Sequence, residues 1–448
     1  MKVANTIYRS VSLLLLTVIL AGGAFAQARE FDVADQVKQV SEFDVNGLKV
    51  LLKRRENAPT LSASLIIRGG VRNVTDKNAG IEKLSLSVAT EGSKKYPRDV
   101  LRRELASTGT SIAASSGLDY SAISMASTLD QFDKSWDIYS DLILNPTFDA
   151  QDVARVREQI IAGLKEEQTD TDTYLELLQR RDIYAGLPYS RAVNGTVVTV
   201  SEFKISEIRE YFSKLMESSR LLLVVVGDID AANLRAKISS SLGKLPKGNY
   251  TEQPLTPAKF EKPSIEVVAR EGLPTNYISG GFLAPSLSDP DYYPMQVAIS
   301  VLATRLFSEV RVRRQLTYAV SADMEENASN SGNLYVTAVD ANEAVGVMLA
   351  IVNNLKTEPL DQDEIDGMAG HFLTRYYLER ETNAAQAAEL AKFELSGGGW
   401  KNSFLLLDRL RRVKPQDVQR VARTYLKNFK WVVIGDPNAV DKAVFTQQ

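Results

Sequence analysis

Two similar helix-opening stretches lie 212 positions apart in this chain: Phe148-Asp149-Ala150-Gln151-Asp152 and Leu360-Asp361-Gln362-Asp363-Glu364. Apolar residues follow both stretches at the spacing i, i+3, i+7, i+8 and i+11, beginning at Val153 in the first copy and at Ile365 in the second. This spacing is typical of one face of an amphipathic helix. The chain is therefore predicted to contain the same helix twice.

A second pair of matching segments supports this repeat. A predicted helix near residue 205 leads to an apolar strand at 221–226, and an equivalent helix near residue 415 leads to a strand at 431–434. Both strands end in the dipeptide Gly-Asp, 208 positions apart. Because two independent patterns repeat at nearly one period, we infer a duplication of roughly 200 residues.

Strands and helices are mixed within each half. In the first half, strands are predicted at 61–67, 111–114 and 120–126, and helices near residues 79, 97, 131 and 150. This pattern predicts an α+β fold of two homologous halves, each an antiparallel-rich sheet with helices packed on one face. The segment 242–264 holds four prolines among polar residues and is predicted to be a linker, because proline interrupts both helices and sheets. The predicted domains are then 29–241 and 265–448.

The N-terminus has the pattern of an export leader. Lys2 and Arg9 supply positive charge, residues 11–20 form an apolar core, and Ala24-Phe25-Ala26 is a small-x-small cleavage pattern. The apolar run is shorter than the ~20 residues that a membrane-spanning helix needs. We therefore expect residues 1–28 to be a signal peptide and the protein to be periplasmic or secreted, with no membrane attachment after the leader is removed.

The composition excludes several kinds of site. Without the leader the chain has 51 basic and 56 acidic residues, a net charge of −5, and no basic stripe, so nucleic-acid binding is not expected. The chain has no cysteine, which excludes disulfides and thiolate ligands, and a single histidine, His371. Catalytic zinc sites usually take two or three imidazoles. This polypeptide therefore cannot assemble a histidine-ligated zinc site of its own.

The region before the first repeated helix has an informative order of elements. The strand at 61–67 is followed by the turn Gly69-Gly70, by a helix that starts at Asn78-Ala79-Gly80, and then by Glu91-Gly92-Ser93. Together with the duplication, this order resembles the pitrilysin/insulinase family of zinc peptidases over nearly the whole chain after the leader. The resemblance implies a zinc motif, H-x-x-E-H, on this helix and a further glutamate ligand on a later helix.

In this chain the four implied positions hold other residues. The histidine positions fall on Lys83 and Ser87, the catalytic glutamate position falls on Leu86, and the distal glutamate position falls on or near Gly163. An ammonium, an alkyl group and a hydroxyl cannot take those roles. The resemblance therefore implies a peptidase homologue with a degenerate zinc motif and no metal of its own.

A second family feature matches residues of the C-terminal half. The resemblance implies an arginine and a tyrosine, seven positions apart, that hold the substrate backbone and the oxyanion; Arg311 and Tyr318 have this spacing. Hydrogen-bond donors aimed at developing negative charge are a large catalytic contribution, often ~3 kcal/mol for one donor. The alternative is that Arg311 caps a helix C-terminus and that Tyr318 fills a strand position. The neighbouring arginines at 305, 313 and 314 are interpreted as solvated surface.

The small-residue strand at 110–116 is a candidate peptide-binding element. In the family the equivalent strand lies at the sheet edge beside the zinc, and extended peptides pair with it through backbone hydrogen bonds. Ala113, Ala114 and Ser115 would leave room for peptide side chains. The alternative is an ordinary sheet strand.

Two functions of different classes follow from the resemblance. In the first, the chain is the non-metal subunit of a heterodimeric zinc peptidase: a paralogous partner carries the zinc, and Arg311 and Tyr318 complete the partner's site for a peptide substrate. In the second, the chain is a non-catalytic scaffold or peptide-binding protein derived from the peptidase fold. A free-standing hydrolase with another site is disfavoured, because His371 is the only imidazole and no nucleophile is placed beside it.

Overall fold

The computed structural model describes residues 33–447 of the chain. The predicted signal peptide, with both of its charged residues and its cleavage pattern, lies outside the described residues. Helix α2 (Val33–Lys38) belongs to a first unit that ends at Lys38, and residues from Gln39 onward form a second unit. Within 33–447 no helix is both long enough and apolar enough to cross a membrane.

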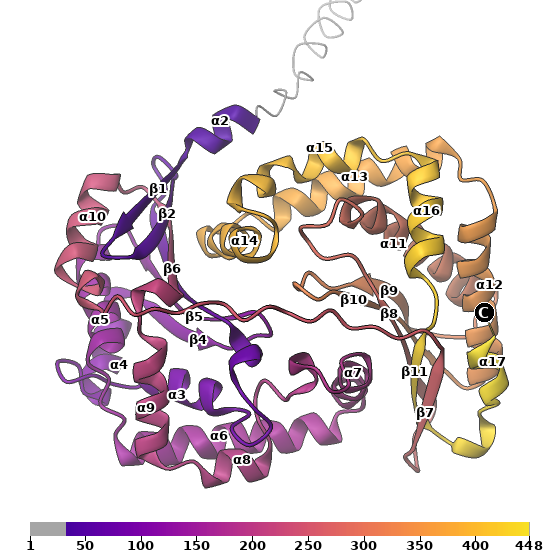
Figure 1. The fold of residues 1–448 in the computed structure, drawn as a ribbon, viewed down its shortest axis with the longest axis horizontal. Coiled ribbons are helices and arrows are strands. Elements are labelled where there is room, and N and C mark those ends of the chain that lie inside the picture. Colours follow the sequence, from indigo (N-terminus) through magenta and orange to yellow (C-terminus); the bar gives the residue numbers. More distant parts are fainter. Residues whose placement is uncertain (1–32, 448) are drawn as a thin grey trace, which may run out of the picture. The chain divides into compact units, whose positions relative to one another are not determined.

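The first half of the second unit is built on a six-stranded sheet with the order β1-β2-β6-β3-β5-β4 (Figure 1). Its strands are β1 (Val40–Val45), β2 (Leu48–Arg54), β3 (Thr60–Arg68), β4 (Ser111–Ser115), β5 (Tyr120–Thr128) and β6 (Leu221–Gly227). The β2–β6 pair is parallel and every other pair in the sheet is antiparallel. Every residue of the central strand β6 is buried, which explains its continuous apolar run.

The second half repeats this plan in a five-stranded sheet with the order β7-β11-β8-β10-β9. Its strands are β7 (Ser264–Ala269), β8 (Asn276–Leu283), β9 (Val320–Met324), β10 (Ser331–Ala338) and β11 (Lys430–Gly435). Again one pair, β7–β11, is parallel and the others are antiparallel. The two sheets therefore have the same topology, except that the second lacks a counterpart of β1. The predicted α+β fold with two homologous halves is confirmed.

Each half has its own set of helices. In the first half they are α3 (Ile81–Ala89), α4 (Arg98–Thr108), α5 (Phe132–Leu144), α6 (Ala150–Thr169), α7 (Thr171–Ile183), α8 (Val197–Glu202), α9 (Ile205–Leu215) and α10 (Ala231–Ser240). In the second half they are α11 (Tyr292–Leu306), α12 (Ala341–Thr357), α13 (Gln362–Leu378), α14 (Asn383–Ser396), α15 (Leu406–Arg411), α16 (Pro415–Tyr425) and α17 (Lys442–Thr446). A π-helical segment, η5 (Phe307–Arg313), follows α11 directly.

The duplicated stretch that opens the sequence forms the N-terminal caps of α6 and α13. The Asp149 carboxylate accepts a hydrogen bond from the Gln151 backbone N–H, and the Asp361 carboxylate accepts one from the Asp363 N–H. An aspartate at this position satisfies a helix N–H that has no partner within the helix. The repeated residues are thus the starts of two equivalent helices.

Each half also contributes one helix to the other half's sheet. Helix α7 packs on β8 and β11, and its Leu175 and Leu178 are buried against Val432 and Ile434 of β11. Helix α14 packs on β3 and β6 in the same way. Its first residue, Asn383, donates a hydrogen bond of 2.7 Å to the Thr60 carbonyl. The exchange of α7 and α14 ties the two halves together.

Residues 245–263 connect the halves without forming a helix or a strand. Their contacts with the first half include the Arg220 guanidinium, 4.6 Å from the Tyr250 ring centre, and an ion pair of Arg72 with Glu252. Asp119, buried at the end of the β4–β5 connection, accepts a hydrogen bond of 2.9 Å from the backbone N–H of Ala328 in the second half. The limits of the predicted linker and domains remain a prediction.

Candidate functional site

Three of the four positions of the degenerate zinc motif line one cavity. Lys83 and Ser87 are one turn apart on α3, Gly163 lies on α6, and all three border a cavity of about 450 Å³. Ala114 of β4 borders it as well. Leu86 does not, because it is fully buried in the core of the first half.

The residues around this cavity do not fit zinc. A zinc ion needs three or four neutral imidazoles, thiolates or carboxylates, and Lys83 places a cationic side chain there instead. The two carboxylates of the lining already have partners: Glu91 pairs with Arg98 and Arg155, and Glu167 accepts a hydrogen bond of 2.8 Å from Asn194. Within residues 33–447 no group of His, Asp or Glu side chains could hold a metal ion.

The one carboxylate of α3, Glu82, is turned away from the cavity into the core. It is buried and accepts hydrogen bonds from the Ser121 hydroxyl and, at 2.7 Å, from the Tyr211 hydroxyl. Desolvation by burial raises the pKa of Glu82, although both hydrogen bonds and the charge of Arg220 favour its ionised form. Glu82 therefore has a structural role. The sequence pattern around it does not distinguish it from a glutamate on the surface of a helix.

The predicted peptide-binding strand is the edge strand β4. Within the described chain it pairs with β5 alone, so one row of its backbone N–H and C=O groups faces away from the sheet. Ala113 and Ser115 are exposed and Ala114, between them, lines the cavity of Lys83 and Ser87. The strand thus has the position that strand addition by an extended peptide requires.

Arg311 and Tyr318 contact each other directly. Arg311 lies in η5, Tyr318 lies just before the edge strand β9, and the guanidinium carbon is 4.5 Å from the tyrosine ring centre. The same guanidinium is 5.2 Å from the ring of Phe307. Tyr318 is 81% exposed, the largest exposed fraction among the large apolar side chains of the described chain. Within residues 33–447 no carboxylate pairs with Arg311.

The exposed surface around this pair is apolar. Phe307 and Val312, which flank Arg311 in η5, are 47% and 56% exposed. A π-helix is rare and, where it occurs, is frequently found at functional sites. The sequence predicts a helix at this point, and the structure shows that its final turns are π-helical and present Arg311 beside Tyr318.

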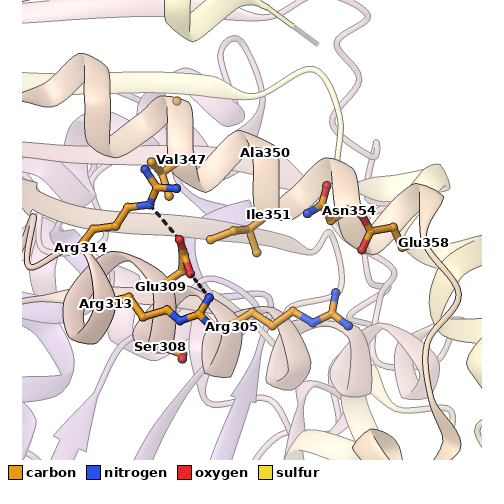
Figure 2. A pocket seen from close by; sticks show the side chains of 11 residues that line it. Arg305, Ser308, Glu309, Arg313, Arg314, Val347, Ala350, Ile351, Asn354 and Glu358 are labelled. Atoms are coloured by element: carbon orange, nitrogen blue, oxygen red, sulfur yellow. Dashed lines mark hydrogen bonds and ion pairs between the residues drawn. The ribbon is translucent and has the colours of Figure 1, made fainter.

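The three neighbouring arginines are engaged around a separate cavity of about 570 Å³ (Figure 2). Arg313 and Arg314 both donate to the Glu309 carboxylate, at 3.0 and 2.9 Å. Arg305 donates two hydrogen bonds to Glu364 of α13, at 2.9 and 2.7 Å. The interpretation of these residues as solvated surface is therefore incomplete: they are partly exposed, but each is ion-paired, which distinguishes them from Arg311.

The chain matches two models of one peptidase family. Residues 49–197 match the model "Insulinase (Peptidase family M16)", and residues 202–369 match the model "Peptidase M16 inactive domain". The first match includes the predicted zinc-motif positions, and the second includes Arg311 and Tyr318.

Three relatives have similar sequences or folds. The chain is 21% identical to the "Non-peptidase homolog YmxG" of Helicobacter pylori over 90% of this chain and 95% of that protein. It is 24% identical to the human mitochondrial "Cytochrome b-c1 complex subunit 1" over 66% of this chain and 60% of that subunit. The first half of the periplasmic protease PqqL from Escherichia coli has a similar fold, with a TM-score of 0.74 and 17% identity over 91% of this chain and 95% of that structure.

The family matches, the duplicated topology and the replaced motif residues lead to one assignment. The predicted motif positions on α3 hold Lys83, Leu86 and Ser87 in place of the histidines and glutamate of an H-x-x-E-H motif. The chain therefore belongs to the insulinase, or M16, family of peptidases and is an inactive homologue within it.

Proposed function

We propose that this protein is the non-metal subunit of a heterodimeric zinc peptidase. A paralogous partner carries the zinc, and this chain binds oligopeptides and supplies Arg311 and Tyr318 to the partner's site. The chain alone has no peptide-bond hydrolase activity.

The observation that carries the proposal is the state of the Arg311–Tyr318 pair. A guanidinium and a phenol that served only to stabilise this chain would be expected to have partners within it. Here Tyr318 is 81% exposed, and within residues 33–447 the Arg311 guanidinium lies near two aromatic rings and forms no ion pair. Both groups are hydrogen-bond donors, and both are available to a carbonyl oxygen brought by another molecule.

The surface around the pair supports a protein partner. Phe307 and Val312 add exposed apolar area to the side chains of Arg311 and Tyr318. Protein interfaces are enriched in aromatic residues and arginine at their centres. Zinc is expected in the partner subunit, where an intact H-x-x-E-H motif would hold it.

Peptide binding is supported by the edge strand β4. Ala113, Ala114 and Ser115 have small side chains, and the strand borders the cavity that Lys83, Ser87 and Gly163 line. A peptide added to this edge would lie over that cavity. Export by the predicted leader would place the protein in the periplasm or outside the cell, and the similar PqqL structure is described as that of a periplasmic protease.

A non-catalytic scaffold is the second candidate. It is favoured by the similarity to a subunit of the mitochondrial cytochrome b-c1 complex, although the alignment covers only 60% of that subunit. In this reading the exposed surface of η5 contacts a structural partner, and the hydroxyl of Tyr318 has no role in chemistry.

The test is cleavage of a quenched fluorescent peptide mixture by the purified chain, alone and combined with an H-x-x-E-H protein encoded beside it. We expect activity only in the combination, and a loss of that activity when Arg311→Ala or Tyr318→Phe is introduced. Activity that is absent from the combination, or unchanged by both substitutions, would refute the active-site role and favour the scaffold.

A further inference from the structure

A third cavity, of about 220 Å³, lies where α7 of the first half meets the second half. Glu176, Gln179 and Arg180 line it from α7, and Glu325, just after β9, lines it from the other side. The cavity shares Glu176 and Arg180 with a larger neighbouring cavity of about 410 Å³.

The larger neighbour continues to the degenerate zinc positions. It shares Glu167 and Asn194 with the cavity that Lys83 and Ser87 line. Three adjoining cavities therefore follow α6 and α7 from the edge strand β4 to Glu325. A peptide held at β4 would lie at one end of this row of cavities, and the second half of the chain lies at the other end.

The cavity between the halves is lined by two residues with a buried polar atom that has no hydrogen-bond partner in the described chain: Gln179, through its Oε1, and Arg180, through its Nε. The side chains of Glu176 and Glu325 form no hydrogen bond and no ion pair with any described residue. Gln179 is 5% exposed; its amide N–H donates to the Lys430 carbonyl at 2.9 Å, but its Oε1 is buried and has no partner within residues 33–447. Leaving a buried acceptor unpaired costs about 1–3 kcal/mol.

The lining of the cavity carries more negative than positive charge. Desolvation raises the pKa of Glu176 and of Glu325, and the charge of Glu176 raises the pKa of Glu325 further. Arg180 is the one cation of the lining; it lies within electrostatic range of both glutamates but forms no ion pair with either. The lining thus has two carboxylates and one guanidinium, and it favours an additional positive charge.

The kind of cation follows from the donor set. A divalent metal prefers six or more oxygen ligands at short distance, or several carboxylates, and the described residues contain no such cluster. An alkylammonium has three N–H donors and a guanidinium has five, with no acceptor on either. The two carboxylates and the Gln179 oxygen match these donors in number and type.

From this arrangement we infer that the cavity lined by Glu176, Gln179 and Glu325 binds the positively charged group of a peptide. The group is a basic side chain or an N-terminal ammonium. The inference rests on the peptide binding proposed above and names the class of peptide. Such a peptide binds at β4 and carries a positively charged group long enough to enter the cavity at the second half.

The experiment measures binding of short fluorescent peptides to the purified full chain without any partner. The parent peptide has one lysine and a free N-terminus. One variant is N-acetylated, a second has norleucine in place of the lysine, and a third carries both changes and has neither positive charge. Peptides are compared on the wild type, on E176Q/E325Q, and on the control E202Q/E210Q. The control removes the same charge from exposed positions of α8 and α9.

We expect removal of the recognised charge to weaken binding to the wild type by roughly 10- to 100-fold, as for hydrogen bonds to charged groups. E176Q/E325Q is expected to weaken binding of the parent by a similar factor and to leave the neutral peptide unchanged, whereas the control alters neither. The acetylated and norleucine peptides identify whether the terminus or the side chain is bound.

Three results would overturn the inference. Equal binding of charged and neutral peptides refutes it while leaving peptide binding intact, and an equal loss for both peptides in E176Q/E325Q shows a structural effect instead. A wild-type chain that binds no peptide refutes it together with the peptide-binding part of the proposed function. The role of Arg311 and Tyr318 is tested separately, by the combined cleavage assay.

Discussion

The Arg311 guanidinium is stacked on the ring of Tyr318, 4.5 Å from its centre, and neither side chain is held by an acidic residue of the described chain. A cation over an aromatic face at an exposed site contributes about 0.5–1 kcal/mol. That is enough to orient the two donors, but it leaves their hydrogen-bonding atoms free for a second molecule.

The first prediction separates activity from stability at this pair. Because both side chains are at the surface, Arg311→Ala and Tyr318→Phe should change the free energy of unfolding by no more than about 1 kcal/mol. The kcat of the combination with the zinc-bearing partner should fall roughly 100-fold, as for the loss of one oxyanion donor. Arg313→Ala, at the exposed neighbour paired with Glu309, is the matched control and should leave kcat unchanged. Equal losses in all three variants would contradict the prediction.

The second prediction concerns the convergence of Lys83, Ser87 and Gly163 on one cavity. The triple variant K83H/S87H/G163E places two imidazoles and a carboxylate there, the ligand set of many catalytic zinc sites. We expect it to retain about one zinc ion per chain after dialysis, measured by elemental analysis, whereas the wild type retains none. K83H/S87H, without the carboxylate, should bind zinc more weakly. A folded triple variant without zinc would show that the three positions do not face a common point.

The third prediction is a pH dependence that arises from Glu82. Burial raises the folded-state pKa above the unfolded value near 4.5, so the contribution of Glu82 to stability is fully present below that pH. That contribution is lost as the pH rises through the folded-state pKa, by up to roughly 1.4 kcal/mol for each pH unit. Glu82→Gln removes the titration. Urea unfolding at pH 5 and pH 8 should therefore show a smaller loss of stability in the variant than in the wild type. Parallel losses would contradict the assignment.

The fourth prediction contrasts two glycines. A Cβ on Gly280 of β8 would lie 2.5 Å from the buried indole ring of Trp431, whereas a Cβ on Gly163 of α6 would meet nothing within 4 Å. Gly280→Ala should destabilise the protein by about 1–3 kcal/mol through overpacking. Gly163→Ala should stabilise it by up to about 1 kcal/mol, because alanine is the better helix former. Thermal unfolding of both variants is the measurement, and effects of the same sign would contradict the prediction.

Much of the fold could be predicted because its signals are local. The helix caps at Asp149 and Asp361, the apolar strand β6 and the strands β3 and β5 each have a pattern in consecutive residues. The hairpin of β1 and β2 had such a signal too, since Asn46-Gly47 adopts the two positive φ angles that tight hairpins need. It was missed because β1 is largely exposed and has no apolar alternation.

Other features depend on tertiary contacts that sequence patterns do not report. The apolar face of α7 predicts burial, but not burial against β11 of the other half. The change from α-helix to π-helix after Leu306 has no local residue signature, so the stacking of Arg311 on Tyr318 could not be derived from their spacing. The pairing of Glu309 with Arg313 and Arg314, by contrast, joins residues four and five positions apart and had a local signal in the sequence.

The exchange of α7 and α14 has a consequence for how each sheet is covered. A single half, if it existed alone, would leave the sheet face that receives the other half's helix open to water, including the surface of Val432 and Ile434. Two copies of such a half could cover both faces by trading their helices about a twofold axis. Because both halves lie in one chain, each receives its covering helix from the same molecule, and the two apolar sheet faces are covered without a second copy.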